Sequence, residues 1–322
     1  MTFTEQQATT FAQAANGVIQ NLERVIHGKR NVLELVVMAL FAEGHVLLED
    51  VPGTGKTTLA RSLAESLAGA WRRIQFTPDL LPADVTGSLI YHQGKADFEF
   101  HPGAVFANIV LADELNRASP RTQSALLEVM EERQHTVDGE TYTMPRPFVV
   151  VATQNPIELD GTYRLPEAQL DRFLVRTGLG YLDIATQVEV LASSRNGHQS
   201  VEPCIDSPTV RQMIRDAETV HAERSVLDYI ARIAEATRTH ESVQLGASTR
   251  GAFALLRASR VLAAMRGQPF VTPDHVRELS VPVLAHRLLL NADAELRQMG
   301  ACLLYTSPSP RDATLSRMPS SA

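Results

Sequence analysis

The stretch that most constrains the fold of this chain is Asp50–Thr58, which reads Asp-Val-Pro-Gly-Thr-Gly-Lys-Thr-Thr. It lies between a short apolar run, His45–Glu49, that predicts a buried strand, and a helical pattern over Thr57–Leu67. The two glycines allow backbone N–H groups to turn toward an anion, and the following helix adds its positive end. Strand, loop and helix together predict a phosphate-binding loop. The alternative is a glycine-rich turn that carries a surface lysine.

Each residue of this loop has an expected role. Lys56 is expected to reach the β- and γ-phosphates of a nucleotide and to act in catalysis, and the Thr57 hydroxyl to coordinate Mg²⁺. The full pattern G-x-x-x-x-G-K-[ST] begins with glycine, where this chain has Asp50. That departure falls at the outer end of the loop. The predicted nucleotide-binding residues of the loop are Gly53, Thr54, Gly55, Lys56, Thr57 and Thr58.

A second predicted strand ends in two acids. Ile109–Ala112 is apolar throughout, as expected of a central parallel strand covered on both faces, and Asp113 and Glu114 follow it. In a domain with a phosphate loop, Asp113 is expected to hold Mg²⁺ through water and Glu114 to polarise the attacking water. Without such a loop the pair would be surface carboxylates at a strand end.

A third predicted strand, Phe148–Ala152, brings Asn155 to the edge where open α/β sheets bind ligands. The Asn155 amide is suited to orienting a water molecule or contacting a γ-phosphate. Asn155-Pro156 is also a turn signal. The residues alone leave both interpretations open.

The order of elements predicts the fold class. Strands and helices alternate up to about Gly178, as in a doubly wound α/β domain, and a hairpin is expected around Asp138-Gly139. After Gly178 only helical spacing follows. We therefore predict an αβα nucleotide-binding domain with a parallel sheet over residues 1–180 and a smaller all-α domain over residues 181–301. The expected helices of the second domain are Asp183–Ser193, Pro208–Val220, Val226–Thr239, Thr249–Arg266 and Pro273–Leu290.

Composition argues against several classes of protein. The chain of 322 residues has a net charge of −7 and no dense block of Lys and Arg, which disfavours nucleic acid as the main ligand. It has no apolar run long enough to predict a transmembrane helix, and its polar N-terminus does not resemble a secretory signal. Cys204 and Cys302 provide neither a disulfide framework nor a cysteine metal site, which fits a reducing cytoplasm.

The segment Cys302–Ala322 differs from the rest of the chain. It is rich in Ser and Pro, shows no periodicity, and resembles the translation of two sequencing adapters in succession. A natural linker is the alternative. We expect an artefactual, disordered tail over residues 302–322 and a helical domain truncated near Ala301.

Five motifs in combination resemble the MoxR family of AAA+ ATPases, in the helix-2-insertion clade. The similarity extends from about Val25 to about Leu290. The resemblance implies a P-loop AAA+ domain with a helical lid, a helix-2 insertion over Thr77–His101, and a second insertion at the Asp138-Gly139 hairpin. The motifs are Asp50–Thr58, Phe76–Gly87, Ile109–Pro120, Ala152–Pro156 and Leu165–Phe173.

The resemblance also implies residue roles that spacing does not. Asn155 would be the sensor 1 residue and Arg250 the sensor 2 residue, while Val25, Ile26 and His27 would pack on the adenine. Arg172 would be an arginine finger that reaches the ATP of a neighbouring subunit.

Two alternatives concern the arginine finger. Arg164 stands where the family more often has proline, and it could compete with Arg172 for the role. Arg172 could instead form an intrachain pair with Asp171 or Glu167.

The implied function is Mg²⁺-dependent ATP hydrolysis by a homo-oligomeric ring, a hexamer, in the cytoplasm. It would drive chaperone-like remodelling or maturation of protein clients, or metal-cofactor insertion, with a von Willebrand factor A-domain protein as partner. Alternatives are a nucleic-acid motor, a metal-chelatase motor subunit and a nucleotide-gated scaffold without turnover. The acidic balance disfavours the first, and the presence of Glu114, Asn155 and Arg172 disfavours the last.

Overall fold

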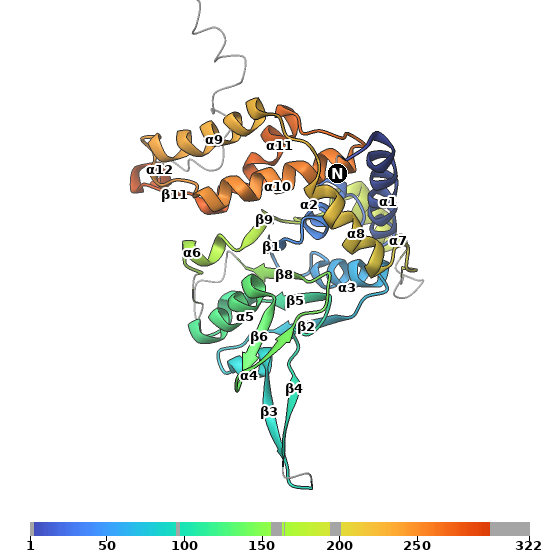
Figure 1. Cartoon of the computed structure of the whole chain (residues 1–322), viewed down its shortest axis with the longest axis vertical. Coiled ribbons are helices and arrows are strands. Elements are labelled where there is room, and N and C mark those ends of the chain that lie inside the picture. The colour runs from blue at the N-terminus through green and yellow to red at the C-terminus, as the bar shows by residue number, and fades with distance from the viewer. Residues whose placement is uncertain (1–2, 95–96, 156–162, 164, 194–200, 297–322) are drawn as a thin grey trace, which may run out of the picture. The chain divides into compact units, whose positions relative to one another are not determined.

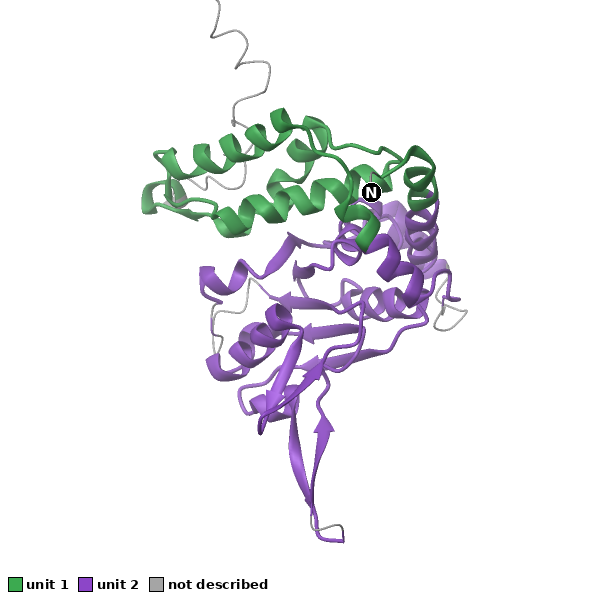
Figure 2. Ribbon diagram, viewed as in Figure 1, with its two compact units in different colours: residues 1–12, 215–322 green, residues 13–214 purple. Residues whose placement is uncertain are grey.

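The computed structural model describes residues 3–94, 97–155, 163, 165–193 and 201–296 (Figure 1). The chain divides into two compact units, residues 13–214 and residues 1–12 with 215–322 (Figure 2). The domain boundary predicted after residue 180 stays a prediction. Arg164 and the segment 302–322 lie outside the described residues.

A five-stranded parallel sheet forms the centre of the larger unit. The strand order is β2-β5-β8-β1-β9, and each neighbouring pair is parallel. The carboxyl ends of all five strands therefore lie at one edge of the sheet, which is where the predicted site residues follow. The strands are β1 (His45–Glu49), β2 (Trp71–Gln75), β5 (Ile109–Asp113), β8 (Val149–Gln154) and β9 (Phe173–Thr177).

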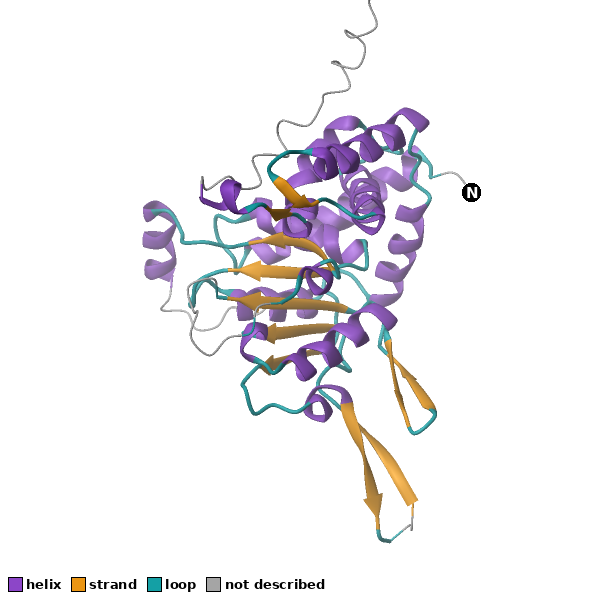
Figure 3. Ribbon diagram, turned by 90° about the vertical axis from the view of Figure 1, so that its left-hand side faces the viewer, coloured by secondary structure: helices purple, strands orange, loops and turns teal. Residues whose placement is uncertain are grey.

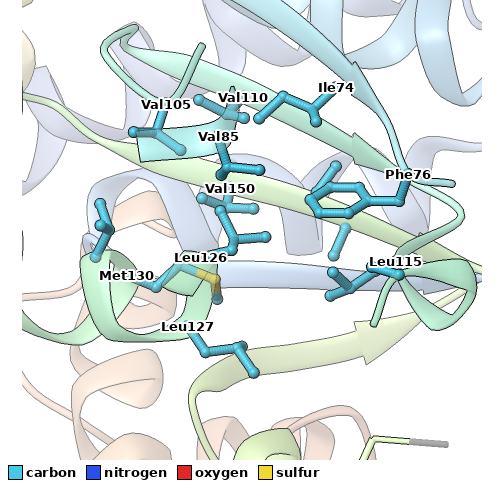
Figure 4. Close-up of a cluster of buried hydrophobic side chains, with 14 of the residues drawn as sticks. Ile74, Phe76, Val85, Val105, Val110, Leu115, Leu126, Leu127, Met130 and Val150 are labelled. Atoms are coloured by element: carbon cyan, nitrogen blue, oxygen red, sulfur yellow. The ribbon is translucent and has the colours of Figure 1, made fainter. Parts of the chain in front are cut away.

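Helices cover both faces of this sheet. β5 is buried at every residue, and because successive side chains of a strand point to opposite faces, both faces must be covered. On one face, Leu126 and Met130 of α5 (Pro120–Glu132) pack with Val110 and Val150 (Figure 4). On the other, α3 (Lys56–Ser66) lies against β2 and β5, and α2 (Arg30–Phe41) against β1 and β9. The predicted αβα arrangement is confirmed.

Two hairpins extend from the larger unit, where insertions were predicted (Figure 3). In the first, β3 (Gly87–His92) pairs with β4 (Asp97–Pro102) after the short helix α4 (Pro82–Thr86). In the second, β6 (Gln134–Val137) pairs with β7 (Glu140–Thr143) at the predicted hairpin, and the positive φ angles of Asp138 and Gly139, 50° and 83°, fit a type I′ turn.

The two hairpins contact each other through aromatic rings. Phe100 of β4 stacks on Tyr142 of β7, with ring centroids 4.0 Å apart. At the root of the first hairpin, a Cβ atom on Gly87 would lie 2.5 Å from the carbonyl oxygen of His101. Only glycine permits so close an approach of two backbone segments.

The smaller unit is mainly helical. Its helices include α9 (Arg224–Thr239), α10 (Thr249–Met265), α11 (Pro273–Leu284), η3 (Ala285–Arg287) and α12 (Ala292–Leu296). The helix predicted to continue to Leu290 ends at Leu284, because β11 (Leu289–Leu290) pairs with β10 (Val243–Leu245). No helix in the described part of the chain is long and apolar enough to cross a membrane.

Three further helices lie outside the smaller unit or only partly within it. One, α7 (Ile184–Ser193), belongs to the larger unit. The other two, α1 (Glu5–Glu23) and α8 (Ser207–Glu218), each have residues in both units.

Candidate nucleotide-binding site

The loop between β1 and α3 has the backbone that an anion site needs. Gly53 and Gly55 have φ angles of 83° and 95°, in the left-handed region that favours glycine. Gly55 is the N-cap residue of α3, and it has no side chain that could cap the first N–H groups of the helix. A Cβ atom on Gly53 would meet no other atom within 4 Å, and the loop is therefore open at this point.

The Lys56 amine is turned toward its own loop. Its Nζ donates to the carbonyl oxygen of Val51 at 2.9 Å and to that of Asp50 at 3.3 Å. These acceptors are neutral carbonyl oxygens, whereas phosphate oxygens carry negative charge and attract an ammonium group more strongly. A phosphate in the loop would therefore compete well for this amine.

Asp113, the last residue of β5, is almost fully buried and bonded at both carboxylate oxygens. Thr153 donates its hydroxyl to Oδ1 at 2.7 Å. Arg73 of β2 donates to Oδ2 from Nη2 at 2.6 Å and from Nε at 3.1 Å. The carboxylate is thus fixed in direction, and a cation already lies beside it.

Glu114 adopts a backbone conformation that is uncommon for a residue other than glycine. Its φ is 57°, and its N–H donates to the Thr153 hydroxyl at 2.9 Å. The carboxylate accepts from Gln75 Nε2 at 2.7 Å and pairs with Arg117 Nη1 at 3.2 Å, Arg117 being the last residue of η1 (Leu115–Arg117). The backbone and these two donors together set the direction of the side chain.

Hydrogen bonds join the loop, the acids and the third predicted strand at one edge of the sheet. Thr153 contacts both acids, and the carbonyl of Gln154 accepts the N–H of Asp50 at 3.1 Å. Asn155 follows directly and is half-buried. The structure therefore brings Lys56, Asp113, Glu114 and Asn155 to the same edge, as predicted from the parallel order of their strands.

The predicted adenine segment borders the phosphate loop. Val25, Ile26 and His27 lie between α1 and α2, and Ile26 is buried. A Cβ atom on Gly55 would lie 3.7 Å from Ile26 Cδ1. The Ile26 side chain thus lies beside the turn from which α3 begins.

The two predicted arginines lie in different units. Arg172, just before β9, donates from Nε to the Glu131 carboxylate of α5 at 2.7 Å. Arg250 is an exposed residue in the first turn of α10 in the smaller unit, two positions after the capping Ser248. The finger and sensor 2 roles stay predictions.

Sequence reasoning missed several side chains of this site, among them Thr153 and Arg117, which contact the two acids. Arg73 and Gln75 are two positions apart in β2, so their side chains lie on the same face of the strand. This spacing is a signal in the sequence that could have drawn attention to them. The partner of Arg172, Glu131, and the contacts of the Asp50 carboxylate have no comparable signal, because they depend on how distant segments pack.

The oxygen atoms available beside the loop fit Mg²⁺ bound together with a nucleotide. Among the described residues, no group of three or more His, Cys, Asp or Glu side chains could hold a metal ion. Mg²⁺ is commonly bound by one or two protein oxygens together with substrate phosphates and water. The Thr57 hydroxyl and the Asp113 carboxylate are such oxygens, and the open loop beside Lys56 could take the phosphates.

This fold and this loop define a nucleotide-binding domain of the AAA type. Residues 45–175 match the ATPase family associated with various cellular activities (AAA), and residues 235–301 match the AAA lid domain.

The similar proteins specify the family further. The chain is 47% identical over 285 residues to the protein YeaC of Bacillus subtilis, covering 88% of this chain and 89% of YeaC. It is 40% identical over 285 residues to Chaperone MoxR1 of Mycobacterium tuberculosis, covering 86% of this chain and 76% of MoxR1. The crystal structure of a candidate ATPase from Cytophaga hutchinsonii superposes with a TM-score of 0.88 at 35% identity, over 95% of this chain and 97% of that one. The chain belongs to the MoxR family of AAA+ ATPases.

Proposed function

We propose that this protein binds ATP with Mg²⁺ at the loop Asp50–Thr58 and hydrolyses it. One observation carries the proposal: the open glycine loop, its lysine, and the acids of β5 lie at one edge of a single parallel sheet. The family match supports nucleotide binding, and the residues in place support turnover.

The roles of the residues follow from their chemistry. Lys56 would leave the carbonyls of Asp50 and Val51 for phosphate oxygens, and the N–H groups of the loop would bind the same phosphates. Thr57 and Asp113 would hold Mg²⁺, which when bound neutralises charge on the β- and γ-phosphates. Glu114 would orient and polarise the attacking water, and Asn155 would contact the water or the γ-phosphate.

Arg73 adds a condition to this scheme. Its guanidinium occupies Asp113 Oδ2, so Asp113 can face a hydrated metal ion only if Arg73 shares or yields that oxygen. The exposed Arg73 side chain, 46% accessible, has room to do so.

Other roles reach beyond the larger unit. We propose that Val25, Ile26 and His27 pack on the adenine, that Arg250 contacts the nucleotide as sensor 2, and that Arg172 acts as a finger on the ATP of a neighbouring subunit. Homo-oligomerisation, as a hexameric ring, is part of this proposal because a finger in trans needs a neighbour.

Hydrolysis would drive the remodelling or maturation of a protein client, or the insertion of a metal cofactor into one. The relative named Chaperone MoxR1 supports a protein client. The two contacting hairpins are the elements that we propose to act on it. A von Willebrand factor A-domain protein as partner and a cytoplasmic location complete the proposal.

The test is Mg²⁺-dependent phosphate release from ATP, with Lys56→Ala as the main variant. We expect Lys56→Ala to abolish ATP binding and turnover, because the remaining loop lacks the cation that faces the phosphates. Arg61→Ala removes a cation from an exposed ion pair of the same helix and is expected to leave both unchanged. An unaltered ATP affinity in Lys56→Ala, or no nucleotide binding by the wild type, would overturn the proposal.

A further inference from the structure

Asp50 is the one residue of the phosphate loop that departs from the general pattern, and its carboxylate is buried. The residue is 5% exposed and follows the last residue of β1. A buried carboxylate needs hydrogen-bond donors. The donors here come from a segment far away in the sequence, immediately after β9.

Two consecutive backbone N–H groups bind this carboxylate. Leu179 donates to Oδ2 at 2.5 Å, and Gly180 donates to Oδ1 at 3.0 Å and to Oδ2 at 3.1 Å. Bonds from N–H groups to a charged acceptor are stronger than bonds between neutral groups. A glycine at position 50 could form none of them.

The backbone after β9 is shaped for this contact. A Cβ atom on Gly178 would lie 2.6 Å from the carbonyl oxygen of Glu49, so the two backbone segments touch. Gly180 has a φ of 62°, in the left-handed region, which helps it to present its N–H beside that of Leu179. The carbonyl of the next residue, Tyr181, accepts from Lys29 Nζ at 2.7 Å.

Asp50 is also bonded through its backbone to the two parts of the site that would sense the nucleotide. Its carbonyl oxygen accepts from Lys56 Nζ, and its N–H donates to the carbonyl of Gln154, the residue before Asn155. A shift of the Lys56 amine to a phosphate would remove the first of these bonds. Residue 50 is thus the point where the loop, the end of β8 and the segment after β9 meet.

We propose that Asp50 is a positioning residue that couples occupancy of the phosphate loop to the segment Gly178–Tyr181, from which the chain continues into α7. When Lys56 turns to a phosphate, the backbone of residue 50 adjusts, and the carboxylate transmits this to Leu179 and Gly180. The inference rests on the proposed function, because it needs a nucleotide in the loop.

The test is hydrogen–deuterium exchange of the full-length protein over a peptide that covers residues 178–183, with and without a non-hydrolysable ATP analogue and Mg²⁺. In the wild type, we expect the analogue to change exchange at Leu179 and Gly180. Asp50→Asn removes the charge with little change of shape. We expect it to speed exchange at these amides about tenfold without nucleotide, since the amides lose a charged acceptor, and to abolish the response to the analogue.

Two further variants sharpen the result. Asp50→Gly restores the glycine of the general pattern and is expected to retain nucleotide binding while losing the response at residues 178–183. Glu49→Gln changes the neighbouring carboxylate, which is partly exposed and paired with Arg176, and is expected to behave as the wild type. If the role of Asp50 were purely structural, its variants would show altered basal exchange but would keep the wild-type response to the analogue.

The outcomes separate this inference from the function on which it rests. If calorimetry detects no analogue bound to the wild type, the proposed function fails, and this inference fails with it. If the analogue binds but exchange at residues 178–183 does not respond, or if Asp50→Asn and Asp50→Gly respond like the wild type, only the coupling is wrong. A missing response in the wild type overturns the coupling even if a variant does not fold, and a response in the wild type supports it when at least one of the two Asp50 variants folds and loses it.

Discussion

Glu114 combines a strained backbone with a carboxylate that has two donors at one oxygen, Oε2. A left-handed conformation costs a residue other than glycine about 1–2 kcal/mol, and here it is maintained by the bond from the Glu114 N–H to Thr153. Such strain is often found where the direction of a side chain matters. The donors Gln75 and Arg117 hold the carboxylate at the end of β5, and they could equally donate to the amide oxygen of a glutamine in its place.

The first prediction concerns this side chain. We expect Glu114→Gln to bind ATP with near wild-type affinity and to lower kcat by about 100-fold or more, because the amide keeps the acceptor oxygen but cannot polarise or deprotonate water. Calorimetry and steady-state phosphate release measure the two effects separately. Glu128→Gln, the same change at an exposed position of α5, should alter neither. Turnover equal to that of the wild type would rule out this role for Glu114.

At the level of residues, the sequence predicts the contiguous parts of the site and not the contacts between distant ones. The loop around Lys56 could be recognised because its glycines, lysine and threonine are neighbours. The pair Arg73–Asp113 joins positions 40 residues apart, and the bond from Gly180 to Asp50 spans 130. Those contacts depend on the order of the strands, which no local pattern contains.

At the level of elements, the start of α11 depends on a buried histidine. His275 is 2% exposed, and its Nδ1 accepts the backbone N–H of Thr272 at 3.1 Å, which closes a capping box. Burial lowers the pKa of His275 below its ordinary value of 6.5, and the nearby Arg266 lowers it further against the opposing effect of Glu278 and Asp274. The neutral imidazole is therefore the form that caps the helix.

A pH dependence follows from that depressed pKa. Well above pH 6.5 the histidine is neutral in both the folded and the unfolded chain, and its contribution to stability is complete. As the pH falls below this value, the unfolded chain binds a proton that the folded chain resists, so the free energy of unfolding falls until the folded pKa is reached.

The second prediction uses this difference. Between pH 7 and pH 5, Tm of the wild type should fall by about 2–4 °C for each kcal/mol by which His275 lowers the free energy of unfolding. In His275→Gln this part of the fall should disappear, because glutamine can accept the Thr272 N–H at any pH. His221→Gln, a change at an exposed histidine of the same unit, should leave the pH dependence intact. Equal slopes of Tm against pH in wild type and His275→Gln would contradict the assignment.

Elements were predicted well where one segment contains the whole signal. The bounds of β1 agree with the apolar run His45–Glu49. Similarly, α5 begins where the sequence has Ser119-Pro120, a pair typical of a helix start, and the Ser119 hydroxyl accepts the N–H of Thr122. β9 was not predicted, since it begins at Phe173, the last residue of a motif that was interpreted for its arginine. The end of α11 was wrong because Leu289 and Leu290 have helical spacing but pair with β10.

At the level of the whole molecule, the alternation of strands and helices and the later helical run sufficed to predict an αβα domain followed by a helical one, because parallel sheets require helical crossovers. The AAA+ class was implied only by the resemblance of the five motifs to a known family. The structure of a single chain does not contain the ATP of a neighbouring subunit, on which Arg172 is proposed to act. Its guanidinium is 27% exposed and paired with Glu131. If it serves a neighbouring site, it must exchange this partner for a phosphate of another subunit, and only mixed assemblies can reveal that exchange.

The last prediction therefore uses two inactive variants. Arg172→Ala should bind ATP but not hydrolyse it, and Glu114→Gln should do the same for a different reason. In a ring mixed in equal amounts, a site formed by Glu114 of an Arg172→Ala protomer and Arg172 of a Glu114→Gln protomer is intact, so about a quarter of the wild-type rate should return. Mixing Glu114→Gln with Lys56→Ala restores no intact site and serves as the control. If mixed rings form but stay inactive, Arg172 does not act in trans; if Arg164→Ala complements in its place, the finger is Arg164.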